Sequence, residues 1–110
     1  MAFWTYSQNN SGGSFDRDRE RGIGEYVIVE AESADAANDK AERIGLYFDG
    51  DGDCSCCGDR WSSQWDYRGG SKVPSVYGDA VSSGNVEGYR TPAGFPTGFV
   101  HYADGRIEGF

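Results

Sequence analysis

The stretch from residue 24 to residue 48 constrains the fold more than any other part of the chain. Its first part holds Tyr26-Val27-Ile28-Val29, a β-branched and nearly continuous apolar run. Such a run predicts a strand that is buried on both faces. Residues 34–44 then predict a helix, because apolar side chains recur there at intervals that bring them onto one helical face. These side chains are Ala34, Ala37, Ala41 and Ile44.

The residues that flank this helix agree with its expected ends. Ser33 is a good N-cap residue, and Gly45 suits the position just beyond the last turn. Asp35 near the start and Arg43 near the end carry the charges that the helix dipole prefers. Leu46-Tyr47-Phe48 then reads as a second buried strand, so that strand, helix and strand together predict a βαβ-like unit.

Both ends of the chain carry further strand signals. Residues 1–6 read as a short strand with aromatic side chains. Near the C-terminus, residues 98–102 and 106–110 flank Ala103-Asp104-Gly105. Asp-Gly between two such runs predicts a β-hairpin.

Together these elements predict a single α+β domain over residues 1–110. We expect a small mixed or antiparallel sheet, one principal helix on one face, and a C-terminal β-hairpin. Ile, Leu, Val and Phe number only 18 of the 110 residues, although three Trp and seven Tyr argue against disorder. Because so small a core often needs added support, we expect a homo-oligomer or a bound metal.

Charge and targeting signals narrow the class of partners. The formal net charge of −8 disfavours nucleic acid polymers and anionic membranes. The N-terminus lacks a basic region followed by an apolar one, so we expect no signal peptide. No apolar run approaches the ~20 residues of a membrane span. Three cysteines so close together do not form a disulfide framework, which favours a reducing cytoplasm.

The most distinctive local feature is the run Cys54-Ser55-Cys56-Cys57-Gly58-Asp59-Arg60-Trp61. Thiolates bind zinc well, and a structural zinc site takes four ligands. The candidate ligands are Cys54, Cys56 and Cys57, with His101, the sole histidine, as the fourth; Asp53 and Asp59 are other options. Two alternatives stay open. The thiols could pack as small apolar groups beside Trp61, or form a redox pair.

An acidic run precedes the cysteines. Asp49-Gly50-Asp51-Gly52-Asp53 resembles the start of an EF-hand loop, in which alternate carboxylates coordinate calcium. The match ends there, because Cys54 stands where glycine is needed and Arg60 stands where glutamate is needed. An acidic turn is therefore the default interpretation.

The polar segment over residues 7–14 is a candidate ligand site. Glycine and asparagine let backbone N–H groups converge into an anion-binding nest, and nearby aromatic rings can stack on a base. We expect Asn9, Asn10, Ser11 and Gly12 to donate to phosphate or ribose, Trp4 or Tyr6 to stack on the base, and Arg60 to pair with phosphate. No Walker or dinucleotide motif is present, so an ordinary flexible loop is the competing interpretation.

The sequence offers little that points to catalysis. Cys56 or Cys57 with His101 is the one pairing that would combine a nucleophile with a base. Neither H-E-x-x-H nor G-x-S-x-G occurs in the chain. We therefore expect a binding protein and not an enzyme.

Three segments together resemble small, uncharacterised proteins of tailed bacteriophages. They are FWTYSQNNSGGSF over residues 3–15, the predicted strand–helix–strand that ends in Gly45-Leu46-Tyr47-Phe48-Asp49-Gly50, and the cysteine run. The resemblance covers roughly the first two-thirds of the chain. It implies a phage origin and expression in the cytoplasm of a bacterial host.

This resemblance also implies a class of function. Small accessory phage proteins often bind a host component, and one class captures nucleotide messengers of bacterial immunity. We therefore expect a non-enzymatic counter-defence protein that sequesters a small nucleotide-derived signal, such as a cyclic dinucleotide or an ADP-ribose derivative. The alternatives are an acidic protein that binds and inhibits a host enzyme, and a zinc-stabilised structural or regulatory module.

Overall fold

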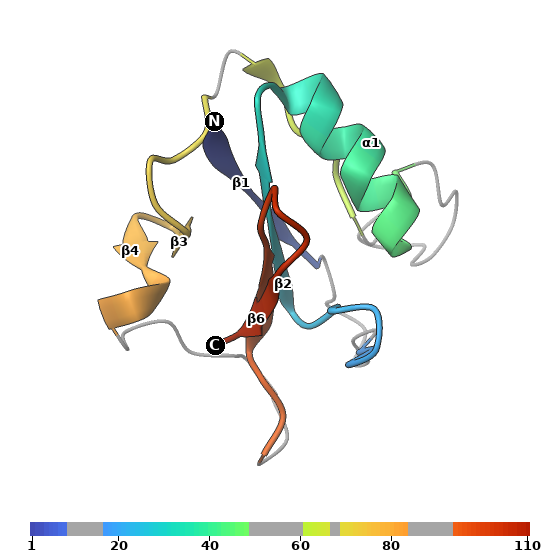
Figure 1. Ribbon diagram of the computed structural model, residues 1–110, viewed down its shortest axis with the longest axis vertical. Coiled ribbons are helices and arrows are strands. Elements are labelled where there is room, and N and C mark those ends of the chain that lie inside the picture. Colours follow the sequence, from blue (N-terminus) through green and yellow to red (C-terminus); the bar gives the residue numbers. More distant parts are fainter. Residues whose placement is uncertain (9–16, 49–60, 67–68, 84–93) are drawn as a thin grey trace, which may run out of the picture.

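The computed structural model describes residues 1–8, 17–48, 61–66, 69–83 and 94–110 (Figure 1). Four strands form one sheet in the spatial order β1-β2-β5-β6. They are β1 (Ala2–Ser7), β2 (Tyr26–Ala31), β5 (Gly98–His101) and β6 (Ile107–Gly109). β1 is antiparallel to β2, β2 is parallel to β5, and β5 is antiparallel to β6. The expected α+β class, mixed sheet and C-terminal hairpin are confirmed.

The principal helix, α1 (Ala34–Ile44), begins and ends where the sequence predicts. The Ser33 hydroxyl accepts a hydrogen bond from the Ala36 N–H at 3.1 Å, so it acts as the N-cap. Gly45 follows the last turn with a φ of 128°, and its N–H donates to the carbonyl oxygens of Ala41 and Glu42. This backbone conformation favours glycine, which explains why the helix stops there.

The main core lies between α1 and one face of the sheet. β1 and β2 present alternate residues to this face, and their register sets Trp4 opposite Val29 and Tyr6 opposite Val27. Three alanines of α1 cover them and are fully buried or nearly so: Ala34, Ala37 and Ala41. Trp61 packs into the same cluster. Small residues on the helix let it lie close to the large side chains of β1.

A second, smaller cluster occupies the opposite face of the sheet. β3 (Ser75–Val76) and β4 (Asp79–Ala80) form a separate two-stranded sheet, followed by the 3-10 helix η2 (Val81–Ser83). Figure 1 shows β3 and β4 on the side of the main sheet that α1 leaves uncovered. Val76 packs there with Ile28 and Val100. Both faces of β2 are therefore buried, as its apolar run predicts.

One predicted element is wrong. Leu46-Tyr47-Phe48 forms no strand. The Leu46 N–H instead donates to the Ala41 carbonyl oxygen at 3.0 Å, which continues the turn that closes the helix. The Leu46 side chain enters the main core. The parallel partner of β2 is β5, near the C-terminus, so the expected βαβ unit does not form over residues 24–48.

None of the helices in the described residues is both long and apolar enough to span a membrane.

Candidate binding pocket at the edge of β1

The outer edge of β1 is only partly covered. Phe3 and Ser71 form an isolated antiparallel bridge, in which each N–H donates to the other's carbonyl oxygen at 2.8 Å. The backbone groups of Phe3 therefore point away from β2. Since backbone direction repeats every second residue along a strand, those of Thr5 and Ser7 point the same way. The Thr5 carbonyl accepts a hydrogen bond from the Gln64 side-chain amide at 2.6 Å.

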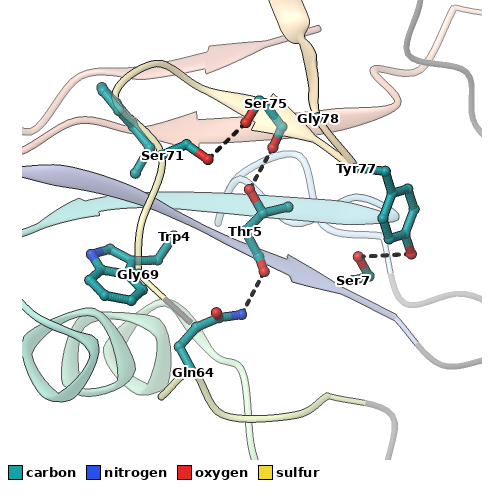
Figure 2. A pocket seen from close by; sticks show the side chains of 10 residues that line it. Trp4, Thr5, Ser7, Gln64, Gly69, Ser71, Ser75, Tyr77 and Gly78 are labelled. Carbon is teal, nitrogen blue, oxygen red and sulfur yellow. Dashed lines mark hydrogen bonds between the residues drawn. The ribbon is translucent and has the colours of Figure 1, made fainter. Parts of the chain in front are cut away.

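A pocket of about 180 Å³ lies along this edge. β1 contributes one wall, the segments around Gln64 and Ser71 a second, and the β3–β4 hairpin a third (Figure 2). The lining residues are Phe3, Trp4, Thr5, Ser7, Gln64, Gly69, Ser71, Ser75, Tyr77 and Gly78. They come from three parts of the chain that the sheet and its second layer bring together.

Hydroxyl groups dominate the polar lining. The Thr5 hydroxyl donates to the Ser75 carbonyl oxygen at 2.6 Å, and the Ser75 hydroxyl donates to that of Ser71 at 3.0 Å (Figure 2). A hydroxyl has one donor and two acceptor positions. In this arrangement the Thr5 hydroxyl oxygen still has its acceptor positions, and the Ser71 hydroxyl still has its hydrogen to donate. The pocket can therefore exchange hydrogen bonds with a hydroxylated ligand without breaking its own.

Tyr77 is the exposed aromatic side chain of the pocket. It lies in the turn that joins β3 to β4, with φ of 50° for Tyr77 and 86° for Gly78. Positive φ at both central residues is the pattern of a type I′ hairpin turn, which favours Asn-Gly or Gly-Gly. The side chain is 84% exposed. Its ring meets that of Tyr26 edge to face at 6.2 Å, and its hydroxyl is 3.4 Å from the Ser7 hydroxyl, to which it donates (Figure 2).

The part of the lining that the structure describes carries no formal charge at neutral pH. None of the lining residues is an acid, a lysine, an arginine or a histidine. Beneath Tyr77, burial is the main cause that raises the pKa of the Tyr26 phenol, with smaller contributions from Tyr77 and Glu25. The phenol of Tyr26 therefore stays protonated. This pocket is suited to a neutral polar group.

The structure corrects the expected role of Trp4 and Tyr6. Their side chains are only 4% and 1% exposed. The Trp4 indole N–H donates to the Ala31 carbonyl oxygen at 3.2 Å, and the Tyr6 hydroxyl donates to Asn38 Oδ1 at 2.8 Å. The Tyr6 ring also stacks on Phe48 at 5.7 Å. Although Trp4 borders the pocket, both rings belong to the core and neither offers a face to a base.

The other expected ligand residues lie outside the described residues. This holds for Asn9, Asn10, Ser11 and Gly12 and for Arg60. In the sequence, Asn9 follows Ser7 by two positions, so the candidate loop begins beside a residue that lines the pocket. Arg60 directly precedes the buried Trp61.

Some of the candidate zinc ligands also lie outside the described residues. Cys54, Cys56 and Cys57 lie outside the described residues, whereas His101 is a buried residue of β5. His101 Nε2 is 2.7 Å from the Gly22 carbonyl oxygen. A carbonyl only accepts, so Nε2 carries the hydrogen and Nδ1 alone has a free lone pair for a metal. Within the described part of the chain, no three potential ligand side chains gather into a metal site.

The surroundings of His101 also set its charge. Burial is the main cause that lowers the pKa of the imidazole, and the positive charge of Lys40 lowers it further. The hydrogen bond with Gly22 opposes both and raises it. Burial prevails, so His101 is neutral at physiological pH.

Sequence reasoning missed most of the pocket. Thr5 and Ser7 alternate with Trp4 and Tyr6, and this period of two is the signal that separates an outer face from a core face. Tyr77-Gly78 is a weaker signal, since a glycine that follows an aromatic residue marks a turn but not its type. Gln64 and Ser71 carried no local signal, because long-range pairing brings them to β1.

Comparison with known proteins places the chain in a family without supplying an activity. No curated protein matches it, and no solved structure matches it. A family described as "Domain of unknown function (DUF7296)" matches residues 1–110. Because this match spans the whole sequence, the chain belongs to the DUF7296 family.

Proposed function

We propose that this protein is a phage-encoded, non-enzymatic binding protein that sequesters a small nucleotide-derived signal of bacterial immunity in the host cytoplasm. The observation that carries the proposal is the pocket at the edge of β1, which combines hydroxyl groups, strand-edge backbone groups and an exposed aromatic ring. A few convergent polar groups beside an aromatic side chain are typical of a small-ligand site. The phage setting comes from the resemblance of three segments together: residues 3–15, the segment that ends in Gly50, and the cysteine run.

The N-terminal polar segment is the second part of the proposed site. In the sequence it follows Ser7, which lines the pocket, and it holds Asn9, Asn10, Ser11 and Gly12. In the proposal these residues donate to phosphate oxygens, and Arg60 pairs with the phosphate charge. The base and ribose then lie toward the pocket.

Isothermal titration calorimetry tests the proposal with a panel of cyclic dinucleotides, ADP-ribose and ADP-ribose derivatives. We expect saturable binding of at least one compound, with one site per chain. Ser7→Ala should weaken it, whereas Ser82→Ala, an exposed serine of η2 that is not part of the pocket lining, should leave it unchanged. No heat from any compound at high protein concentration would rule the proposal out.

A second candidate function is inhibition of a host protein. The observation that favours it is the edge of β1 beyond Phe3, where the Thr5 N–H and the Ser7 backbone groups point outward and an extended partner segment could pair as an added strand. Pull-down from host lysate separates the two functions. A stoichiometric protein partner favours the inhibitor, and a small molecule released from the protein on heating favours the sequestering function. Native mass spectrometry of the same sample also tests the proposed homo-oligomer.

A further inference from the structure

Building on the proposed function, we infer that the pocket holds the uncharged nucleoside part of the ligand, with Tyr77 as the residue that stacks on the base. The phosphates then lie outside the pocket. This assigns to Tyr77 the role that the sequence suggested for Trp4 or Tyr6, both of which are in the core.

The backbone of Tyr77 is the first support. A φ of 50° places it in the left-handed region, which disfavours residues other than glycine, asparagine and aspartate. A strained conformation of this kind is often retained where a residue has a function. The strain does not serve packing here, because the side chain is 84% exposed. A ligand contact gives the ring a role beyond its edge-to-face contact with Tyr26 and its hydrogen bond to Ser7.

The orientation of the ring is the second support. Tyr77 and Tyr26 meet edge to face, with an interplanar angle of 88°. In this arrangement Tyr26 contacts at most one face of the Tyr77 ring, so the other face is open to stacking. The Tyr77 hydroxyl, 3.4 Å from that of Ser7, directs the ring toward β1 (Figure 2). The ring is therefore held beside the pocket before a ligand arrives.

The polar lining is the third support. The spare hydrogen of Ser71 and the spare acceptor positions of Thr5 match the hydroxyl groups of a ribose, each of which both donates and accepts. A phosphate needs cations or several N–H donors, and no lysine or arginine is among the described residues that line this pocket. The net charge of −8 adds repulsion at long range. The pocket thus favours the neutral end of a nucleotide.

The size of the pocket agrees with partial occupancy. Sites that enclose a drug-sized ligand begin at about 300 Å³, and this pocket has about 180 Å³. It can take one portion of a dinucleotide or of an ADP-ribose derivative, and the rest must extend beyond it.

The test compares the wild-type chain with Tyr77→Asn and Tyr77→Phe. Asparagine removes the ring and is favoured in this turn, so Tyr77→Asn keeps the fold; phenylalanine keeps the ring and removes only the hydroxyl. Calorimetry is run with adenosine, guanosine, their 5′-monophosphates, cyclic dinucleotides and ADP-ribose. For each compound that binds, we expect Tyr77→Asn to weaken affinity about tenfold or more, and Tyr77→Phe to change it by less than about threefold. The matching free nucleoside should compete for the same site.

The possible failures have different meanings. Binding that Tyr77→Asn leaves unchanged would overturn this inference and leave the proposed function in place. The inference would also be overturned if a nucleotide bound but its own free nucleoside did not compete with it, since the phosphate would then be the part held in the pocket. If no compound binds at all, the proposed function fails and this inference fails with it.

Discussion

Asn38 of α1 accepts a hydrogen bond from the Tyr6 hydroxyl of β1 at 2.8 Å. The same side chain accepts from the Gln64 N–H at 2.8 Å and donates to the Gln64 carbonyl oxygen at 3.1 Å. One amide therefore joins the helix, the edge strand and the segment that carries Gln64. Since Gln64 also donates to Thr5 at the pocket, this network links the main core to the candidate site.

Asn38→Ala should lower the free energy of unfolding by about 2–3 kcal/mol, because it leaves the buried Tyr6 hydroxyl and two backbone groups of Gln64 without partners. Urea denaturation followed by tryptophan fluorescence measures this change. Asp39→Ala, an exposed neighbour on the same helix, is the matched control and should cost less than about 0.5 kcal/mol. Equal losses for the two variants would mean that the network does not stabilise the fold.

Tyr77→Asn should raise the free energy of unfolding by about 0.5–1 kcal/mol, because asparagine relieves the strain of a positive φ. Thermal and urea denaturation both report this gain. Tyr77→Ala removes the same ring but keeps the strain, and we expect no gain from it. A stabilisation by alanine that matched the one by asparagine would point to the ring, and not the backbone, as the source of strain.

The pH dependence of stability should carry a contribution from His101. Burial lowers the pKa of this imidazole in the folded state, whereas in the unfolded chain it is about 6.5. Below that pH the unfolded chain binds more protons than the folded one, so stability is complete above pH ~6.5 and falls as the pH decreases toward the folded pKa. His101→Gln preserves a donor for the Gly22 carbonyl oxygen but does not titrate.

The measurement is the difference in unfolding free energy between wild type and His101→Gln from pH 8 to pH 5, with a chelator present. The difference isolates His101 from the carboxylates, which also titrate at acid pH. We expect the wild type to lose more stability than the variant as the pH falls through ~6.5. Parallel curves would show that His101 keeps its ordinary pKa in the folded protein.

Zinc should copurify with the protein if Cys54, Cys56, Cys57 and His101 form the proposed site. Elemental analysis of freshly purified protein should then give close to one zinc per chain, and a chelator should lower the melting temperature. Less than about 0.2 zinc per chain would count against the site. His101→Gln separates two ligand sets, since a zinc content that it leaves unchanged assigns the fourth ligand to another residue.

Elements with local signals could be predicted from the sequence. α1 has both of its ends encoded nearby, by the hydroxyl of Ser33 and by the positive φ that Gly45 accepts. The C-terminal hairpin follows from Asp104-Gly105 in the same way. In each case the deciding interactions join residues only a few positions apart, so a short window of sequence contains them.

Elements that depend on distant partners could not be predicted from the sequence. The short apolar run Leu46–Phe48 is compatible with a strand or with a buried turn, and the Ala41 carbonyl oxygen decides for the turn. The choice of β5 as the parallel partner of β2 has no counterpart in any local pattern. Pairing across that distance is fixed by the packing of the whole sheet.

The candidate site likewise combines features that the sequence predicts with features that it does not. The alternation along β1 separates Trp4 and Tyr6 from Thr5 and Ser7, but only the position of α1 decides which set is buried. The exposed ring of Tyr77 depends on the turn type between β3 and β4, which a glycine-rich stretch does not specify. Aromatic residues near a polar loop suggested a stacking platform, and we assign that role to Tyr77, in another part of the chain.

The parallel pairing of β2 with β5 also governs when the protein can fold during its synthesis. Residues 32–97 separate the two strands, and a ribosome needs roughly 3–13 s to add them at about 5–20 residues per second. Throughout this interval the nascent chain holds its most apolar strand with one edge unpaired. Premature termination before residue 98 would leave that edge permanently open to association with other chains. The four-stranded sheet is therefore a late event, because β5 and β6 are synthesised after its other two strands.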